Sequence, residues 1–249
     1  MLTDREFSLE VCVDNVVSLH ACVAQSVQRV ELCAALPLGG LTPNYGLLQY
    51  ATRCPVPVMV MIRPRAGDFI FNTMELELMC DDIAAVQAAG LHGVVLGAST
   101  VDAQLDIPVL EQLCTAAGSL EKTLHRCIDT LADPLAAIDT AIALGFDRIL
   151  TSGGARTALL GNAQLAACQH HAAGRIEIMA GAGLTPVQAE RLWHETGIEA
   201  FHASCTKRIQ SNPALTELGF SAESEAVIDA DTIKDYQRTF ARLSRLQPH

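Results

Sequence analysis

The sequence has few aromatic residues, few basic residues, no long apolar run and no closely paired cysteines. Aromatic residues make up 4% of the 249 residues, and 17 Lys and Arg stand against 28 Asp and Glu, for a formal net charge of -11. Such a chain lacks the basic patch that binds a phosphate backbone. No stretch approaches the roughly 18 apolar residues of a membrane helix, and charged residues precede the first apolar run. We therefore expect a soluble cytoplasmic protein with no nucleic-acid or membrane partner.

The nine cysteines are scattered and odd in number. They stand at positions 12, 22, 33, 54, 80, 114, 127, 168 and 205, with no C-x-x-C pair. This spacing disfavours a disulfide scaffold and a zinc ribbon or finger. Most of the thiols are expected to be small buried hydrophobes, so a functional cysteine has to be identified by its position in the fold.

Short apolar runs alternate with helical patterns along the whole chain. Eight runs are predicted as strands: Ser8–Val13, Gln28–Cys33, Pro57–Arg63, His92–Gly97, Lys122–Arg126, Asp147–Ser152, Arg175–Ala180 and Glu199–Ser204. Strict alternation over roughly the ~250 residues typical of the fold predicts an α/β protein with a single (β/α)8 TIM barrel as one domain over residues 1–249. A doubly wound sheet is the alternative, but the first predicted strand is followed by no G-x-G-x-x-G turn.

Residues with helix-capping chemistry mark where the helices begin and end. Predicted starts are Asp14, Thr42 before Pro43, Thr73, Asp106, Asp133 and Thr185 before Pro186. Predicted ends are Gly90, Gly118, Gly145, Gly174 and Gly197. After the eighth strand we expect a loop over about residues 205–230 and a last helix over about 231–245.

Alternation along each strand predicts which side chains enter the barrel. Because successive residues of a strand face opposite sides, the apolar set takes the helix layer and the other set points inward. The inward set is Glu10, Cys12, Glu31, Cys33, Met59, Met61, Arg63, Thr123, His125, Glu177, Met179, His202 and Ser204. The first two strands carry the same Glu-x-Cys unit, so Cys12 and Cys33 are expected near each other at the barrel mouth.

So many ionisable groups inside a barrel point to a site, because each costs several kcal/mol unless it is paired. The alternative is a structural network of ion pairs, for example Glu31 with Arg63 or Glu177 with His125. Glu10, Glu31, Glu177, His125 and His202 are candidates for general acid or base, and Asp129 for orienting an imidazole.

Anion-binding features are expected at the same end of the barrel. Ser152, Gly153 and Gly154 follow the sixth predicted strand, and Gly181 and Gly183 follow the seventh, where backbone amides can hold phosphate or carboxylate. Arg63 and Arg65 flank a proline and can clamp an anion. These residues predict a small anionic ligand.

Several stretches together resemble the copper homeostasis protein CutC family. They are LEVCVDN, RVELC-AALPLGGLTP, VMIRPRAGDF, HRCIDTLADP, GFDRILTSGG and FHAS, in the family's order from Leu9 to Ser204. The resemblance implies a (β/α)8 barrel, a cytoplasmic location, a homodimer and a role in copper homeostasis through Cu(I) held by Cys12 and Cys33. The chain departs from the family pattern at Gly181-Ala182-Gly183, where a run of three glycines is usual.

Two classes of function therefore stand open. The first is Cu(I) binding by Cys12 and Cys33, to which the thioether of Met59 or Met61 can contribute. The second is an enzyme that acts on a small phosphorylated or carboxylated metabolite by acid–base chemistry. A barrel that binds a ligand without any reaction carries the same residues.

Overall fold

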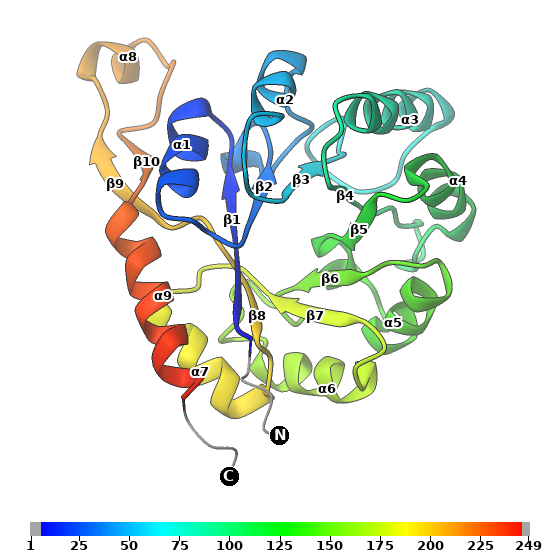
Figure 1. Ribbon diagram of the computed structural model, residues 1–249. Coiled ribbons are helices and arrows are strands. Elements are labelled where there is room, and N and C mark those ends of the chain that lie inside the picture. The colour runs from blue at the N-terminus through cyan, green and yellow to red at the C-terminus, as the bar shows by residue number, and fades with distance from the viewer. Residues whose placement is uncertain (1–5, 246–249) are drawn as a thin grey trace.

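The computed structural model describes residues 6–245 and contains a closed barrel of eight parallel strands in sequence order (Figure 1). The strands are β1 Ser8–Val13, β2 Arg29–Leu32, β3 Val58–Met61, β4 Gly93–Leu96, β5 Glu121–Leu124, β6 Arg148–Thr151, β7 Glu177–Ala180 and β8 Ala200–Ala203. Seven of them lie within their predicted runs, and β5 begins one residue before its run. The predicted (β/α)8 barrel is therefore confirmed.

Helices cover the outside of the barrel (Figure 1). They are α1 Val16–Ala24, α2 Tyr45–Ala51, α3 Thr73–Ala88, α4 Ile107–Ala117, α5 Pro134–Ala143, α6 Asn162–Ala172, α7 Pro186–Thr196 and α9 Ala230–Leu243. Two short 3-10 helices, η1 Leu36–Leu38 and η2 Arg126–Thr130, follow β2 and β5 at the C-terminal end of the barrel.

The predicted alternation of the strands holds in the structure. Val58 and Val60 of β3, and Ile62 just after it, pack in the large core between strands and helices. Met59 and Met61 instead form a separate interior cluster with Cys33 and Val95. The two apolar layers arise because every parallel strand is covered on both faces.

Side-chain caps set the helix starts, and three of them differ from the predictions. Asn15 rather than Asp14 caps α1, and Asp14 accepts from the backbone N–H of Leu36. Asn44 caps α2, two residues beyond the predicted Thr42 start, because the Thr42 hydroxyl accepts from the backbone N–H of Arg63. At α3 the cap is Asn72, one residue before Thr73. The starts at Asp106, Asp133 and Thr185 are confirmed.

The segment expected as a loop over 205–230 contains regular structure instead. β9 Thr206–Gln210 and β10 Ser224–Ile228 form an antiparallel pair, and the short helix α8 Pro213–Glu217 lies between them. This arm extends from the barrel beside α1 (Figure 1). The sequence analysis missed it because its strands carry polar residues and are largely exposed.

After the arm, α9 packs between α7 and α1 and completes the ring of helices. Phe240 of α9 stacks on Phe7 with ring centroids 5.3 Å apart, and Phe7 meets Trp193 of α7 edge-on at 5.5 Å. No helix within residues 6–245 has the length and apolar character to cross a membrane. All nine cysteines are free thiols.

Candidate functional site

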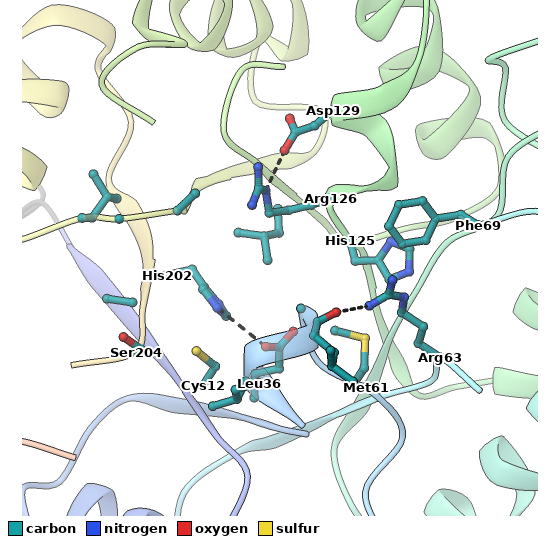
Figure 2. A pocket seen from close by; sticks show the side chains of 18 of the residues that line it. Cys12, Leu36, Met61, Arg63, Phe69, His125, Arg126, Asp129, His202 and Ser204 are labelled. Carbon is teal, nitrogen blue, oxygen red and sulfur yellow. Dashed lines mark hydrogen bonds and ion pairs between the residues drawn. The ribbon is translucent and has the colours of Figure 1, made fainter. Parts of the chain in front are cut away.

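A cavity of about 520 Å³ opens at the C-terminal end of the barrel strands. Residues of β1, β2, β3, β6 and β8, and of the loops that follow β2, β3, β5, β7 and β8, line it (Figure 2). Volume and position are those of a small-molecule site in a TIM barrel. Of the predicted site residues, the cavity brings together Cys12, Glu31, Arg63, His125, Asp129, Gly183 and His202.

Cys12, Glu31 and His202 form one group on the wall of the cavity. Each offers one ligand atom, and the three atoms all lie within 4.8 Å of one another. The strand register explains the grouping, since Cys12 pairs with Glu31 on β2 while Glu10, two residues earlier, pairs with His202 on β8. Thiol sulfur, imidazole nitrogen and carboxylate oxygen thus converge from three adjacent strands.

A buried carboxylate behind this group orients the imidazole. His202 Nδ1 lies 2.9 Å from Glu10 Oε1, and its Nε2 faces Glu31 Oε2 at 3.6 Å. Glu10 also accepts from Arg29 Nε at 2.7 Å. The second Glu31 oxygen, Oε1, is buried and has no hydrogen-bond partner among the described residues.

Electrostatics within the group favour a proton on its imidazole. Burial opposes charge on His202, but Cys12, Glu31 and Glu10 raise the pKa of His202 well above its usual range. Burial also opposes ionisation of Glu10, yet His202 and Arg29 hold the pKa of Glu10 below its usual range. Burial raises the pKa of Glu31. The charges that surround His202 thus favour the protonated form of its ring, whereas burial favours the neutral form of Glu31.

Cys33 lies outside the three-residue group, although its side chain faces the interior as predicted. In the pairing of β1 with β2, Cys12 lies opposite Glu31, and Cys33 comes two residues later. The two Glu-x-Cys units are therefore offset by two residues. The Cys33 Sγ lies 3.4 Å from Glu31 Oε2 and packs with Met59 and Met61. Burial raises the pKa of Cys33 well above its ordinary value.

Arg63, Phe69 and His125 form a second wall of the cavity, termed here the Arg63 wall (Figure 2). The Arg63 guanidinium lies over the Phe69 ring at 4.9 Å from its centroid, and Phe69 meets the His125 ring at 4.8 Å. Gly97 allows this placement of His125, because a Cβ there would lie 2.7 Å from the imidazole. Sequence reasoning missed Phe69, whose loop carries no periodic signal.

Asp129 fills the predicted anion cradle after β6. Its carboxylate accepts from the backbone N–H groups of Ser152 and Gly154 and from the hydroxyls of Thr151 and Ser152. Arg126 adds an ion pair at 2.7 Å. Two of the amides that were predicted to hold a ligand's phosphate therefore hold this side chain, while the Gly153 N–H donates to the Thr151 hydroxyl. None of Ser152, Gly153 and Gly154 lines the cavity.

Arg65 and Glu177 lie away from the cavity, which corrects their expected positions. Arg65 pairs with Asp68 and Glu75 at the surface. Glu177 begins β7, at the N-terminal end of the barrel, and pairs with Arg148. Glu177 was misplaced because alternation gives the face of a strand but not the position of a residue along the barrel axis. Arg65 was expected beside Arg63 only because a single proline separates the two in the sequence.

The interior ion pairs are also other than those considered from the sequence. Arg29 joins Glu10 to Glu121, and Arg148 joins Glu121 to Glu177. Neither Glu31 with Arg63 nor Glu177 with His125 is paired. The interior positions of Arg29 and Glu121 could have been predicted from the sequence, since each stands two residues before a residue predicted to face inward.

The loop after β7 contributes to the cavity through Ala182 and Gly183, whereas Gly181 donates its backbone N–H to Thr151 and does not line the cavity. Ala182 has a φ of +84°, a conformation that favours glycine, as its departure from the three-glycine pattern implied. Its carbonyl accepts from the backbone N–H of Ala158 at 3.1 Å, which helps to hold the turn.

Known proteins are similar to this chain over most of its length. The family model described as CutC family matches residues 7–207. A family protein CutC from Agrobacterium fabrum (strain C58) is 46% identical over 229 residues, 91% of this chain and 91% of that protein. Another from Rhizobium meliloti (strain 1021) is 47% identical, over 91% of this chain and 93% of that protein.

Solved structures are similar to this chain in fold. A crystal structure from Streptococcus agalactiae, whose description connects CutC with copper homeostasis, matches with a TM-score of 0.77 at 33% identity, over 80% of this chain and 99% of that one. A thiamine phosphate pyrophosphorylase from Pyrococcus furiosus matches with a TM-score of 0.58 at 13% identity, over 95% and 96%. The second likeness concerns the barrel alone.

Proposed function

Since the chain belongs to the CutC family, we propose that its cavity binds Cu(I) through Cys12, His202 and Glu31. The observation that carries the proposal is the convergence of three ligand atoms within 4.8 Å of one another on the cavity wall. Thiolate sulfur favours Cu(I), and imidazole nitrogen is a common second ligand. The described connection of a solved relative with copper homeostasis supports the choice of metal.

The surroundings of His202 fit a metal ligand. Metal-binding histidines usually donate their other ring N–H to a carboxylate, which fixes the tautomer and the ring orientation. Glu10 provides that carboxylate at 2.9 Å from Nδ1, which leaves Nε2, 3.6 Å from Glu31 Oε2, as the nitrogen for the metal. The unpartnered Glu31 Oε1 is a buried acceptor that a bound cation would satisfy.

In this proposal Cys33 is not a required ligand. Its thiol is buried among Met59, Met61 and Val95, and its pKa is raised well above the ordinary value, which disfavours the thiolate that binds metal. The pair of cysteines predicted from the sequence is thereby replaced by one cysteine with a histidine and a glutamate. Cytoplasmic location and a homodimer stay predictions.

Anaerobic competition with a chromophoric Cu(I) chelator tests the proposal. We expect the wild-type protein to take one Cu(I) per chain, and Cys12→Ser to lose this binding. Cys33→Ser is the matched control, a neighbouring cysteine in the same barrel, and is expected to bind like wild type. Unchanged affinity in Cys12→Ser, or loss of binding in Cys33→Ser alone, would contradict the assignment.

A further inference from the structure

The Arg63 wall holds a buried cation that no carboxylate neutralises. Arg63 is 5% exposed and forms no ion pair within residues 6–245. The other interior arginines, Arg29 and Arg148, are each paired with two carboxylates. A buried unpaired charge costs several kcal/mol, so its presence in a cavity calls for an anion.

Backbone carbonyls fix the guanidinium but leave part of it free. Nη1 donates to the carbonyls of Leu38 and Gly40 at 3.0 and 3.1 Å, and Nη2 donates to that of Gly67 at 2.9 Å. Nε is buried without a partner among the described residues. Because a guanidinium has five N–H donors, Nε–H and one hydrogen of Nη2 are left without an acceptor from residues 6–245.

His125 adds an unpaired donor to the same wall. Its Nδ1 accepts from the backbone N–H of Cys127 at 3.2 Å, so the neutral ring carries its proton on Nε2. Burial, together with the charge of Arg63, lowers the pKa of His125 to about 3, which keeps the ring neutral. Nε2 is also buried without a partner within the described chain.

We propose that the Arg63 wall binds the anionic group, phosphate or carboxylate, of a small organic molecule that occupies the cavity. Arg63 supplies the charge and a pair of N–H donors, and His125 supplies a third donor. Carboxylate and phosphate oxygens are the acceptors that match this set. The inference deepens the assignment of the cavity as a binding site but does not depend on which metal, if any, Cys12 holds.

This assignment differs from the clamp expected from the sequence. Arg65 is committed to Asp68 and Glu75 outside the cavity, and the loop after β6 is committed to Asp129. One arginine and one histidine remain, on the side of the cavity away from His202 (Figure 2). The ligand would therefore lie between the Arg63 wall and the candidate metal group.

Anion binding is best measured in the Cys12→Ser variant, which separates it from metal binding. Thermal unfolding and calorimetric titration are followed with inorganic phosphate and with malonate, at ionic strength held constant with sodium chloride. We expect at least one of the two anions to bind and to raise the melting temperature above the chloride control. Phosphate binding alone assigns a phosphorylated ligand, and malonate binding alone a carboxylated one.

Two substitutions at Arg63 then test the residue, each added to Cys12→Ser. Arg63→Gln removes the charge. Arg63→Lys keeps the charge but lacks the paired N–H donors of a guanidinium, so both substitutions are expected to weaken anion binding by about tenfold or more. Arg65→Gln is the matched control and should bind like its parent. Absence of binding of both anions, or binding that survives in a folded Arg63→Lys protein, overturns the proposal.

Discussion

At the residue scale, His125 shows how burial sets the protonation of one side chain. The ring is 3% exposed and faces the Arg63 cation, and both effects oppose a second proton. Its pKa falls to about 3 in the folded protein, compared with roughly 6.5 in an unfolded chain. Between these values the unfolded state binds a proton that the folded state does not, so stability falls as the pH falls.

This difference predicts a pH dependence that a single substitution reduces. Between pH 8 and pH 5 the His125 contribution lowers the free energy of unfolding by about 2 kcal/mol. His125→Asn keeps an acceptor for the Cys127 N–H and removes the titration, so urea unfolding should show a drop smaller by that amount. His170→Asn, at an exposed position, should behave like wild type. An unchanged drop in His125→Asn would contradict the environment described for the ring.

Residue chemistry also decided which site predictions could be made from the sequence. Glu10, Cys12, Glu31, Arg63, His125 and His202 were placed in the interior because polar groups alternate with apolar ones along their strands. The destination of Asp129 was not predictable, because its carboxylate caps a loop from β6 that lies more than twenty residues away in the chain. The acid–base roles expected for Glu10, Glu31, Glu177, His125, His202 and Asp129 stay predictions.

At the element scale, the register between strands determines the candidate metal group. The Glu-x-Cys repeat predicted two cysteines side by side, but β1 and β2 pair Cys12 with Glu31. Sequence periodicity gives the face of a strand and not its offset from a neighbour, which in a closed barrel follows from strand tilt. The sequence could therefore predict that these side chains face the interior, but not which of them lie next to one another.

The helix α9 closes the barrel through an aromatic contact that can be tested. Phe240 is 5% exposed and packs on Phe7, Phe201 and Tyr236. Phe240→Ala should lower the free energy of unfolding by about 3–5 kcal/mol in urea denaturation, because it leaves a cavity at the closing seam.

The arm offers the matched control for this substitution. Phe220 follows α8 and is 79% exposed, so Phe220→Ala should change the free energy of unfolding by no more than about 0.5 kcal/mol. Equal effects of the two substitutions would show that α9 does not contribute to closing the barrel in the way described.

At the scale of the whole molecule, a chain of contacting charged side chains runs through the barrel. Glu177, Arg148, Glu121, Arg29, Glu10, His202 and Glu31 follow one another by contact from the N-terminal end of the barrel to the cavity. Arg63 stands apart from this path, and so it is free to meet a ligand. Of the four carboxylates on this path, Glu10 and Glu31 are buried, whereas Glu121 and Glu177 at its N-terminal end reach solvent.

The barrel itself was predictable because its order is local. Each buried parallel strand is a short apolar run, and helix caps separate the runs, so eight units could be counted without knowledge of tertiary contacts. The arm over β9 and β10 was not predictable in this way, because its strands gain their pairing from each other and bury little.

The central claim is that Cys12, His202 and Glu31 hold Cu(I) in the cavity. X-ray absorption at the copper K-edge of the Cu(I)-loaded wild-type protein tests it most directly, because the extended fine structure separates sulfur from nitrogen or oxygen ligands. The account predicts one sulfur together with nitrogen and oxygen neighbours, and loss of the sulfur contribution in Cys12→Ser. Two sulfur ligands in the wild type, or a sulfur contribution that persists in Cys12→Ser, would contradict it.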